Sequence, residues 1–279
     1  MATPLHEDGY RVNTAVLPTL VNFLIEKGVK GLFVGGTTGE GILLSLSERK
    51  RLHEETMTAV NGRVPILLHV GANRTDTAVA LTQHAVQLGA DAIVALPPFF
   101  YGIDEDSLTA YFKAVAAAAP ETPLLLYDIP QLAINGISPA LLARLSREIS
   151  SLAGVKTSRP DAQIIRQLLD AAPDHLIMLA GNERIALGSL AMGADGLISG
   201  LSTAVPEPFV ALTRAVGQGD LNAARQAHQT INQLLDLMPP QRIGAIKTIL
   251  AERGVPVGPA VPPRPMPQGE VWPQMKALL

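Results

Sequence analysis

The sequence contains no cysteine among its 279 residues, and this absence removes several kinds of chemistry. A chain without cysteine forms no disulfide, no zinc–thiolate site and no cysteine nucleophile. It is compatible with a reducing compartment, and we expect a cytoplasmic protein. The histidines show no metal-ligand spacing, so we also expect no metal site.

Strong charge of one sign and long apolar runs are missing as well. The net charge is −3, with no basic arm and no basic–aromatic patch, so neither nucleic acid nor an anionic membrane surface is an expected partner. The start, "MATPLHEDGYRVNTAV", has no basic segment followed by an apolar block, so no signal peptide is visible. The apolar runs are far shorter than the roughly 20 residues that a membrane span needs. We expect a soluble protein.

What the sequence does contain is an alternation of short apolar runs and amphipathic segments. Hydrophobic residues make up 47% of the chain, which is enough for a large core. Short runs rich in Leu or β-branched residues, each ending in Gly, Pro or polar residues, are typical of strands buried on both faces of a parallel sheet. The expected strands lie at 31–36, 66–71, 92–98, 123–130, 154–158, 176–182 and 196–200.

Helical patterns separate these runs. The segment 47–60 is preceded by Ser45, with Glu48 three residues later, which is the arrangement of a capping box. A weak repeat, "EKGVKGLFVG", "QLGADAIVAL" and "AMGADGLISG", reads each time as helix end, glycine, strand. The glycine suits the left-handed position that ends a helix.

Repeated strand–helix units give either a doubly wound open sheet or a closed (β/α)8 barrel. We favour the barrel, because no Rossmann phosphate fingerprint follows any early strand and the length suits one barrel. A barrel needs an eighth strand, for which "MATP" is the remaining candidate, so we expect a truncated first strand. We assign residues 1–205 to the barrel. Residues 206–279 are expected to form a C-terminal helical extension with a Pro-rich strap, "VPVGPAVPPRPMP".

Chemistry in such barrels lies at the carboxyl ends of the strands, and Lys156 in "AGVKTS" stands at one of them. Burial disfavours the charged form of a lysine and leaves more free amine, which can attack a carbonyl carbon and form a Schiff base. The alternative is a lysine that reaches solvent from the strand end. The letters "GVK" alone do not choose between the two.

Two further segments carry candidate groups. Tyr127 ends "LLLYDIP" and could relay protons, or it could be a core tyrosine with a satisfied hydroxyl. Asp128 would point to the opposite face of the strand and is a weaker candidate for a base. In "GGTTGEG" the glycines have Walker spacing, but the required Lys and Ser/Thr are absent. This segment is either a flexible turn or a cradle in which Thr37 and Thr38 hold a small anion such as a carboxylate.

The remaining polar residues give weaker signals. His69 in "LLHVG" reads as a hydrogen-bonded core histidine. Ser158 and Ser199 lack a His and Asp partner in any recognisable arrangement, so a serine hydrolase is not expected.

The motifs "GGTTGE", "YDIP" and "GVKTS", in that order, resemble those of the dihydrodipicolinate synthase / N-acetylneuraminate lyase family of class I aldolases. "SLSERKRL", "GADGLISG" and "GPAVPPRP" extend the resemblance through almost the whole chain. It implies a (β/α)8 barrel with a C-terminal helical extension, assembled as a homotetramer of two tight dimers. It also implies pyruvate or another 2-keto acid as the small-molecule partner, with no metal or organic cofactor.

The resemblance also implies roles for single residues. Lys156 would form a Schiff base with the keto carbon, Tyr127 would shuttle the proton, and Thr38 would join a hydroxyl relay. The imine would then acidify the adjacent carbon for making or breaking an aldol bond, or for dehydration. The substrate-binding set that it implies comprises Gly36, Thr37, Thr38, Leu132, Glu183, Ile198 and Ser199.

Departures from the family pattern bear on the second substrate. Members that make dihydrodipicolinate carry an arginine, which clamps a carboxylate, where this sequence has Leu132. They also carry a tyrosine, lent across the dimer, where this sequence has Phe100; Tyr101 beside it is the candidate relay. Both differences argue against dihydrodipicolinate synthesis.

Sialate lyases place an aliphatic residue at the Leu132 position but use an Asp-Glu pair where this chain reads "GNERIAL". Glu183 can bind a hydroxyl there, while Arg184 is an unfamiliar charge. We therefore expect a lyase acting on a 2-keto-3-deoxy or 4-hydroxy-2-keto acid, including N-acetylneuraminate-like substrates. The alternatives are a dihydrodipicolinate synthase that condenses pyruvate with aspartate semialdehyde, and a catalytically reduced homologue that only binds a keto acid. The presence of Lys156 and Tyr127 disfavours the last.

Overall fold

A computed structural model describes residues 1–279. The chain forms two compact units, which we describe separately: Met1–Ile66 together with Ser199–Leu279 (the discontinuous unit), and Leu67–Ile198 (the central unit). Seven strands follow one another in sequence order, from β1 to β7. The predicted boundary at residue 205 falls inside the discontinuous unit and stays a prediction.

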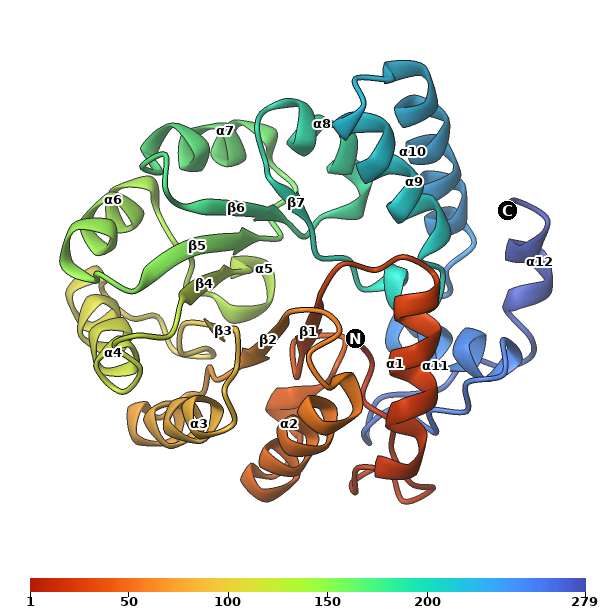
Figure 1. Ribbon diagram of the computed structural model, residues 1–279, viewed down its shortest axis with the longest axis horizontal. Helices are drawn as coiled ribbons and strands as arrows, with labels where there is room; N and C mark the ends of the chain where they lie inside the picture. Colours follow the sequence, from red (N-terminus) through yellow and green to blue (C-terminus); the bar gives the residue numbers. More distant parts are fainter. The chain divides into compact units, whose positions relative to one another are not determined.

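The central unit is built on parallel strands, each followed by a helix (Figure 1). Strands β3 and β4 are buried along their whole length, as continuous apolar runs in a parallel sheet should be. The strands are β2 (Ile66–His69, whose first residue belongs to the other unit), β3 (Ala92–Ala95), β4 (Leu124–Asp128), β5 (Leu152–Thr157), β6 (Ile177–Ala180) and β7 (Gly196–Leu197). The helices are α3 (Thr75–Gln87), α4 (Glu105–Ala117), α5 (Pro130–Ala133), α6 (Pro139–Glu148), α7 (Ala162–Ala171) and α8 (Ala186–Ala191), with the short η3 (Glu183–Ile185).

The discontinuous unit is mostly helical, and α9 packs against α10. Its first part contains η1 (Thr14–Val16), α1 (Leu17–Glu26), β1 (Leu32–Val34), η2 (Gly41–Leu43) and α2 (Leu46–Val60). Its second part contains η4 (Leu201–Thr203), α9 (Glu207–Gly217), α10 (Leu221–Asp236), α11 (Arg242–Glu252) and α12 (Trp272–Lys276). All seven predicted strands and the predicted helices are confirmed. None of the helices combines the length and the apolar composition that crossing a membrane requires.

The local signals behind these elements are largely confirmed. Ser45 is the N-cap of α2 and accepts from the Glu48 backbone N–H at 3.2 Å. The Glu48 carboxylate accepts from the backbone N–H of Val12 at 2.6 Å, so it fixes the N-terminal segment on α2. The glycines of the repeat all adopt positive φ, at 88°, 71° and 113°, which ends the helix before each strand: Gly28, Gly89 and Gly193.

Residues 1–4 form no strand. The Met1 ammonium donates to the carbonyl of Phe33 at 2.6 Å, and the Thr3 hydroxyl donates to the carbonyl of Gly39 at 2.5 Å. The segment thus lies beside β1 and the loop that follows it. The expected truncation of a first strand stays a prediction.

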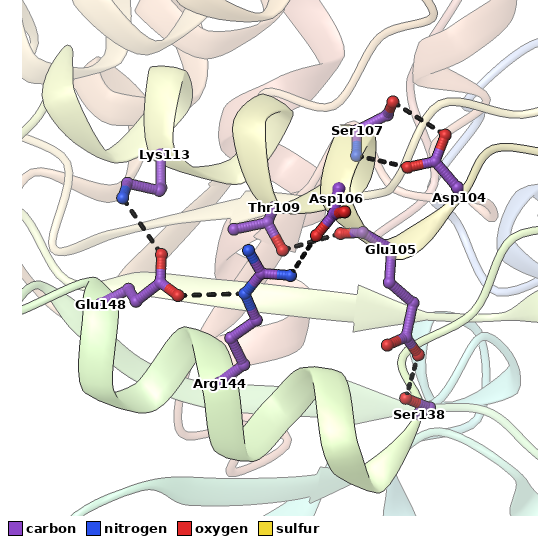
Figure 2. A network of polar contacts seen from close by, with 9 residues as sticks. All are labelled: Asp104, Glu105, Asp106, Ser107, Thr109, Lys113, Ser138, Arg144 and Glu148. Carbon is purple, nitrogen blue, oxygen red and sulfur yellow. Dashed lines mark hydrogen bonds and ion pairs between the residues drawn. The ribbon is translucent and has the colours of Figure 1, made fainter.

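A polar network joins α4 to α6 on the surface of the central unit (Figure 2). Ser138, the N-cap of α6, donates to Glu105 at 2.5 Å, and Arg144 bridges Asp106 at 2.5 Å and Glu148 at 3.0 Å. Hydrogen bonds from Arg144 and then from Lys113 hold the pKa of Glu148 below its ordinary value. The network fixes the starts of both helices, and therefore the ends of the loops before them.

Candidate active site

Lys156 and Tyr127 lie side by side on neighbouring strands of the central unit. Tyr127 on β4 and Lys156 on β5 are direct register partners. The Lys156 side chain does not reach solvent, because the residue is only 5% exposed, and Tyr127 is 2% exposed. The Lys156 Nζ lies over the Tyr127 ring, 3.9 Å from its centroid. The structure therefore excludes the solvent-reaching alternative and puts the amine against an aromatic face.

His69 is the third side chain of this group. It ends β2, is buried, and meets the Tyr127 ring edge to face, with 6.2 Å between ring centroids. Its expected burial is confirmed, and the contact places it beside the Tyr127 ring. Lys156, Tyr127 and His69 form a buried row, which we call the amine row.

Gly181, at the end of β6, closes one side of the amine row. Its backbone N–H donates to the Thr157 carbonyl at 2.7 Å. A Cβ at this position would lie 3.0 Å from the Lys156 Cε and would overlap the Ser158 hydroxyl. A glycine is needed here because backbone packs directly on the lysine side chain, a role that "LAGNE" alone did not reveal.

Asp128 and Thr157 occupy the face opposite to the amine row, as strand alternation predicts. They are register partners, and the Thr157 hydroxyl donates to the Asp128 carboxylate at 2.8 Å. Asp128 is fully buried and also bonds Arg159. Its carboxylate is thus held away from Lys156, which agrees with its low rank as a candidate base.

The segments that carry Tyr101 and Leu132 are brought together by a buried asparagine. Asn135 donates to the carbonyls of Pro98 and Tyr101, both at 2.7 Å, and accepts from the backbone N–H of Ile103 at 2.9 Å. Tyr101 is 72% exposed and Leu132 is 63% exposed. Their proposed roles, as relay and as substrate contact, stay predictions. Beside Tyr101, Phe100 is exposed and adopts φ 78°, a left-handed conformation that is unusual for this residue type.

Two more predicted residues lie at the ends of β6 and β7. Glu183 begins the short η3 turn and is half-buried, while Arg184 beside it is exposed. Ile198 donates its backbone N–H to the Ala180 carbonyl at 2.9 Å and so continues the pairing of β7 with β6. Their substrate contacts stay predictions. No group of three or more His, Asp or Glu side chains in residues 1–279 is arranged to hold a metal ion.

Gly36, Thr37, Thr38 and Ser199 belong to the discontinuous unit. The loop 35–41 closes on itself, because Gly41 donates its N–H to Gly36 at 3.4 Å. A Cβ on Gly41 would overlap the Gly35 carbonyl. The two threonines therefore lie at the tip of a compact turn. Ser199 accepts from the backbone N–H of Ser202 at 3.0 Å, just before η4.

A buried ion pair holds this loop. Glu40, at φ 55°, has its Oε2 2.9 Å from the Lys247 Nζ, and both side chains are fully buried. The Glu40 Oε1 accepts from the Val261 N–H at 3.0 Å, and Lys247 donates to the Pro259 carbonyl at 2.6 Å. Burial lowers the pKa of Lys247, and the Glu40 charge opposes this shift. The pair was missed from sequence, although "GAIKTIL" places a lysine in an apolar run just as "AGVKTS" does.

Comparison with known proteins identifies the family. The sequence model of the dihydrodipicolinate synthetase family matches residues 1–279. The chain belongs to this family. It is 33% identical to the 4-hydroxy-tetrahydrodipicolinate synthase of Methanopyrus kandleri, over 100% of this chain and 92% of that one.

Two solved structures of family proteins are similar as well. The Ruminococcus gnavus sialic acid aldolase, as its catalytic lysine mutant, matches with a TM-score of 0.93 and 29% identity, over 99% of this chain and 92% of that one. YagE from E. coli K12, in complex with pyruvate, matches with a TM-score of 0.92 and 30% identity, over 100% of this chain and 95% of that one. These likenesses confirm the TIM-barrel fold class with C-terminal helices. The chain is a lyase of the class I aldolase type and a pyruvate-dependent aldolase.

Proposed function

We propose that this aldolase forms a Schiff base between Lys156 and pyruvate, and that it cleaves or makes 2-keto-3-deoxy or 4-hydroxy-2-keto acids. The observation that carries the proposal is the buried Lys156 amine lying against the Tyr127 ring. An amine held there can attack the carbonyl carbon of a keto acid and form a Schiff base. The sialic acid aldolase above has a catalytic lysine, and YagE binds pyruvate, which supports the same chemistry here.

The proposed reaction begins with attack of the Lys156 nitrogen on the keto carbon of pyruvate. A proton passes from nitrogen to oxygen and gives a carbinolamine. Its hydroxyl takes up a further proton and leaves as water, which gives the protonated imine. The protonated imine accepts the electrons left when the neighbouring carbon loses a proton, and the resulting enamine adds to an aldehyde. Cleavage is the reverse. Tyr127 contacts the lysine and is the group we assign to proton transfer in the carbinolamine steps.

Thr37 and Thr38 keep their predicted role of holding the pyruvyl carboxylate, with Thr38 also in the proton relay. The closed turn that carries them supports this role, since a fixed loop presents its hydroxyls without further ordering. No metal or organic cofactor enters the proposed chemistry, because the imine itself is the electron sink.

The neutral side chain of Leu132 favours an aldehyde without a distal carboxylate. Leu132 is exposed on α5 and offers no charge to a second acid group. A dihydrodipicolinate synthase is the second candidate, favoured by the identity with the Methanopyrus kandleri synthase over the whole chain. A catalytically reduced, keto-acid-binding homologue is the third.

Borohydride reduction in the presence of pyruvate, followed by intact mass and peptide mapping, tests the proposal. We expect one reduced pyruvyl adduct, located at Lys156. Lys156→Arg should lose it, whereas Lys247→Arg, a change at the other buried lysine, should retain it. Well-folded wild type without an adduct would overturn both enzyme candidates and leave the binding homologue.

A coupled substrate panel then decides between the two enzyme candidates. We expect pyruvate release from 2-keto-3-deoxy sugar acids and no condensation of pyruvate with aspartate semialdehyde. The reverse result would identify a dihydrodipicolinate synthase.

A further inference from the structure

Asp128, which is fully buried, and Arg159, whose side chain is 21% exposed, form a clamp on the face opposite to the amine row. The Asp128 Oδ2 accepts from the Arg159 Nε at 2.7 Å, and its Oδ1 accepts from Nη2 at 3.1 Å. The carboxylate also accepts from the Thr157 hydroxyl at 2.8 Å and from the Ile137 N–H at 2.9 Å. A carboxylate fixed by an arginine fork and two further donors has one orientation, because each bond is directional.

The clamp joins three segments of the central unit. Asp128 ends β4, Arg159 follows the end of β5, and Ile137 lies just before α6. Arg159 Nη2 also donates to the Ile137 carbonyl at 3.3 Å, and Gln131 donates to the Ser158 carbonyl at 2.7 Å. The segment 129–137, which carries Leu132, is therefore tied to the end of the lysine-bearing strand.

Because side chains alternate along each strand, the clamp also restricts the positions of Tyr127 and Lys156 in the amine row. Tyr127 and Lys156 are register partners on one face, and the next pair, Asp128 and Thr157, is hydrogen-bonded on the other. Rotation or sliding of either strand end would move both pairs together. The contact between the Lys156 Nζ and the Tyr127 ring thus depends on bonds made by side chains that do not touch it.

We propose that Arg159 is a positioning residue that acts through Asp128 to fix Lys156 and Tyr127 in the geometry required for imine formation. This inference rests on the proposed function, since it concerns the rate of the same step. A displacement of about 1 Å can cost about a hundredfold in rate, so loss of the fork should slow imine formation with little change in stability once the buried charge is also removed.

The test measures the rate constant of imine formation, by quenching samples with excess borohydride at successive times after mixing with saturating pyruvate, together with urea unfolding, on the full chain. Four variants are compared: Arg159→Met, Arg159→Lys, Asp128→Asn, and the double variant Asp128→Asn/Arg159→Met. Arg159→Met should slow trapping by about tenfold or more and destabilise the protein, because a buried carboxylate loses its partner. Arg159→Lys should fall between this variant and wild type, because an ammonium keeps the charge without the fork.

The double variant separates positioning from a merely structural role. Replacing a buried ion pair by neutral groups is often nearly neutral for stability, so we expect unfolding close to wild type while trapping stays about tenfold slow or slower. Recovery of the trapping rate together with stability would overturn the inference. If Arg159→Met does not fold, the double variant and Arg159→Lys give the same decision.

Arg253→Met is the matched control. Arg253 makes a second two-bond pair, with Glu207, at 2.5 and 3.2 Å in the discontinuous unit. The Arg253→Met variant should be less stable than wild type, but its folded form should be trapped at the wild-type rate. If Arg253→Met and Arg159→Met slow trapping equally, the inference is contradicted. Wild type that is never trapped would overturn the proposed function as well, whereas trapped wild type with an unaffected Arg159→Met would overturn only the inference.

Discussion

The loop after β1 and the loop after β4 are each anchored by a buried carboxylate, but the two anchors differ in kind. Glu40 pairs with Lys247, a point charge on α11, whereas Asp128 pairs with the planar fork of Arg159, which lies just after the end of the next strand. Both Glu40 and Lys247 side chains are fully buried, while that of Arg159 keeps some exposure. The first anchor mainly compensates a buried charge, whereas the second mainly fixes the orientation of the carboxylate through its two directional bonds.

The two loops require different properties from their anchors. The loop 35–41 is already closed by its own backbone and by glycine packing, so its anchor only has to balance the negative charge of Glu40. The loop 129–137 contains the short helix α5 and has backbone bonds of its own, and the bonds of Arg159 and Gln131 orient it on the end of β5. Breaking the first anchor should therefore affect stability most, and breaking the second should affect the rate of the proposed chemistry.

The largest effect on stability is expected from Lys247→Met. It leaves the Glu40 charge buried without its ammonium, and removal of one partner from a buried pair costs about 3–5 kcal/mol. The measurement is the free energy of unfolding in urea at neutral pH. The double variant Glu40→Gln/Lys247→Met should recover most of the loss, and equal losses in the single and double variants would contradict charge compensation as the purpose of this anchor.

A smaller effect is expected from a methyl group placed inside each loop. In Gly41→Ala the new Cβ would overlap the Gly35 backbone carbonyl, whereas in Gly136→Ala it would meet side-chain atoms, the Arg159 Nη2 at 2.5 Å and the Asp128 Oδ1 at 3.0 Å, which can shift without moving backbone. We expect Gly41→Ala to cost about 1–3 kcal/mol, the usual range for overpacking, and Gly136→Ala to cost less. Urea unfolding of the two variants checks the order, and a larger loss for Gly136→Ala would reverse our view of which loop is rigid.

The smallest effect is expected at the helix starts. Ser138 caps α6, accepting from the Leu141 N–H at 3.0 Å, and it also donates to Glu105 on α4. Ser45 caps α2. Each Ser→Ala change should cost about 1 kcal/mol, with the larger loss at Ser138 because its bond to α4 is lost too. Ser146→Ala, within α6, is the control and should cost almost nothing; thermal melting that ranks Ser146 above Ser138 would argue against capping as the cause.

The strands and helices could be predicted because their signals are local. Continuous apolar runs marked all seven strands, and the repeated glycines marked the helix ends before three of them. The pairing of Lys156 with Tyr127 could also be predicted from the sequence, since a lysine and a tyrosine at the ends of successive strands must lie close together in a parallel sheet.

The supporting groups could not be predicted, because each depends on a partner from another segment. Strand alternation indicated that Asp128 faces away from Lys156, but nothing in the sequence pairs it with Arg159. Glu40 and Lys247 are separated by most of the chain, and in the sequence Glu40 is simply one residue of a glycine-rich turn. Nothing in the sequence distinguishes Gly181 from the other glycines, because its role depends on its contact with the Lys156 side chain.

The bond from Val261 to Glu40 has a consequence for the order in which the protein folds during synthesis. The central unit is one continuous stretch of chain and can close as soon as it has left the ribosome. The loop after β1 is made early, but its buried carboxylate meets Lys247 and Val261 only when the end of the chain arrives. We therefore expect the segment with Thr37 and Thr38 to be among the last to reach its final form, although it is among the first to be synthesised.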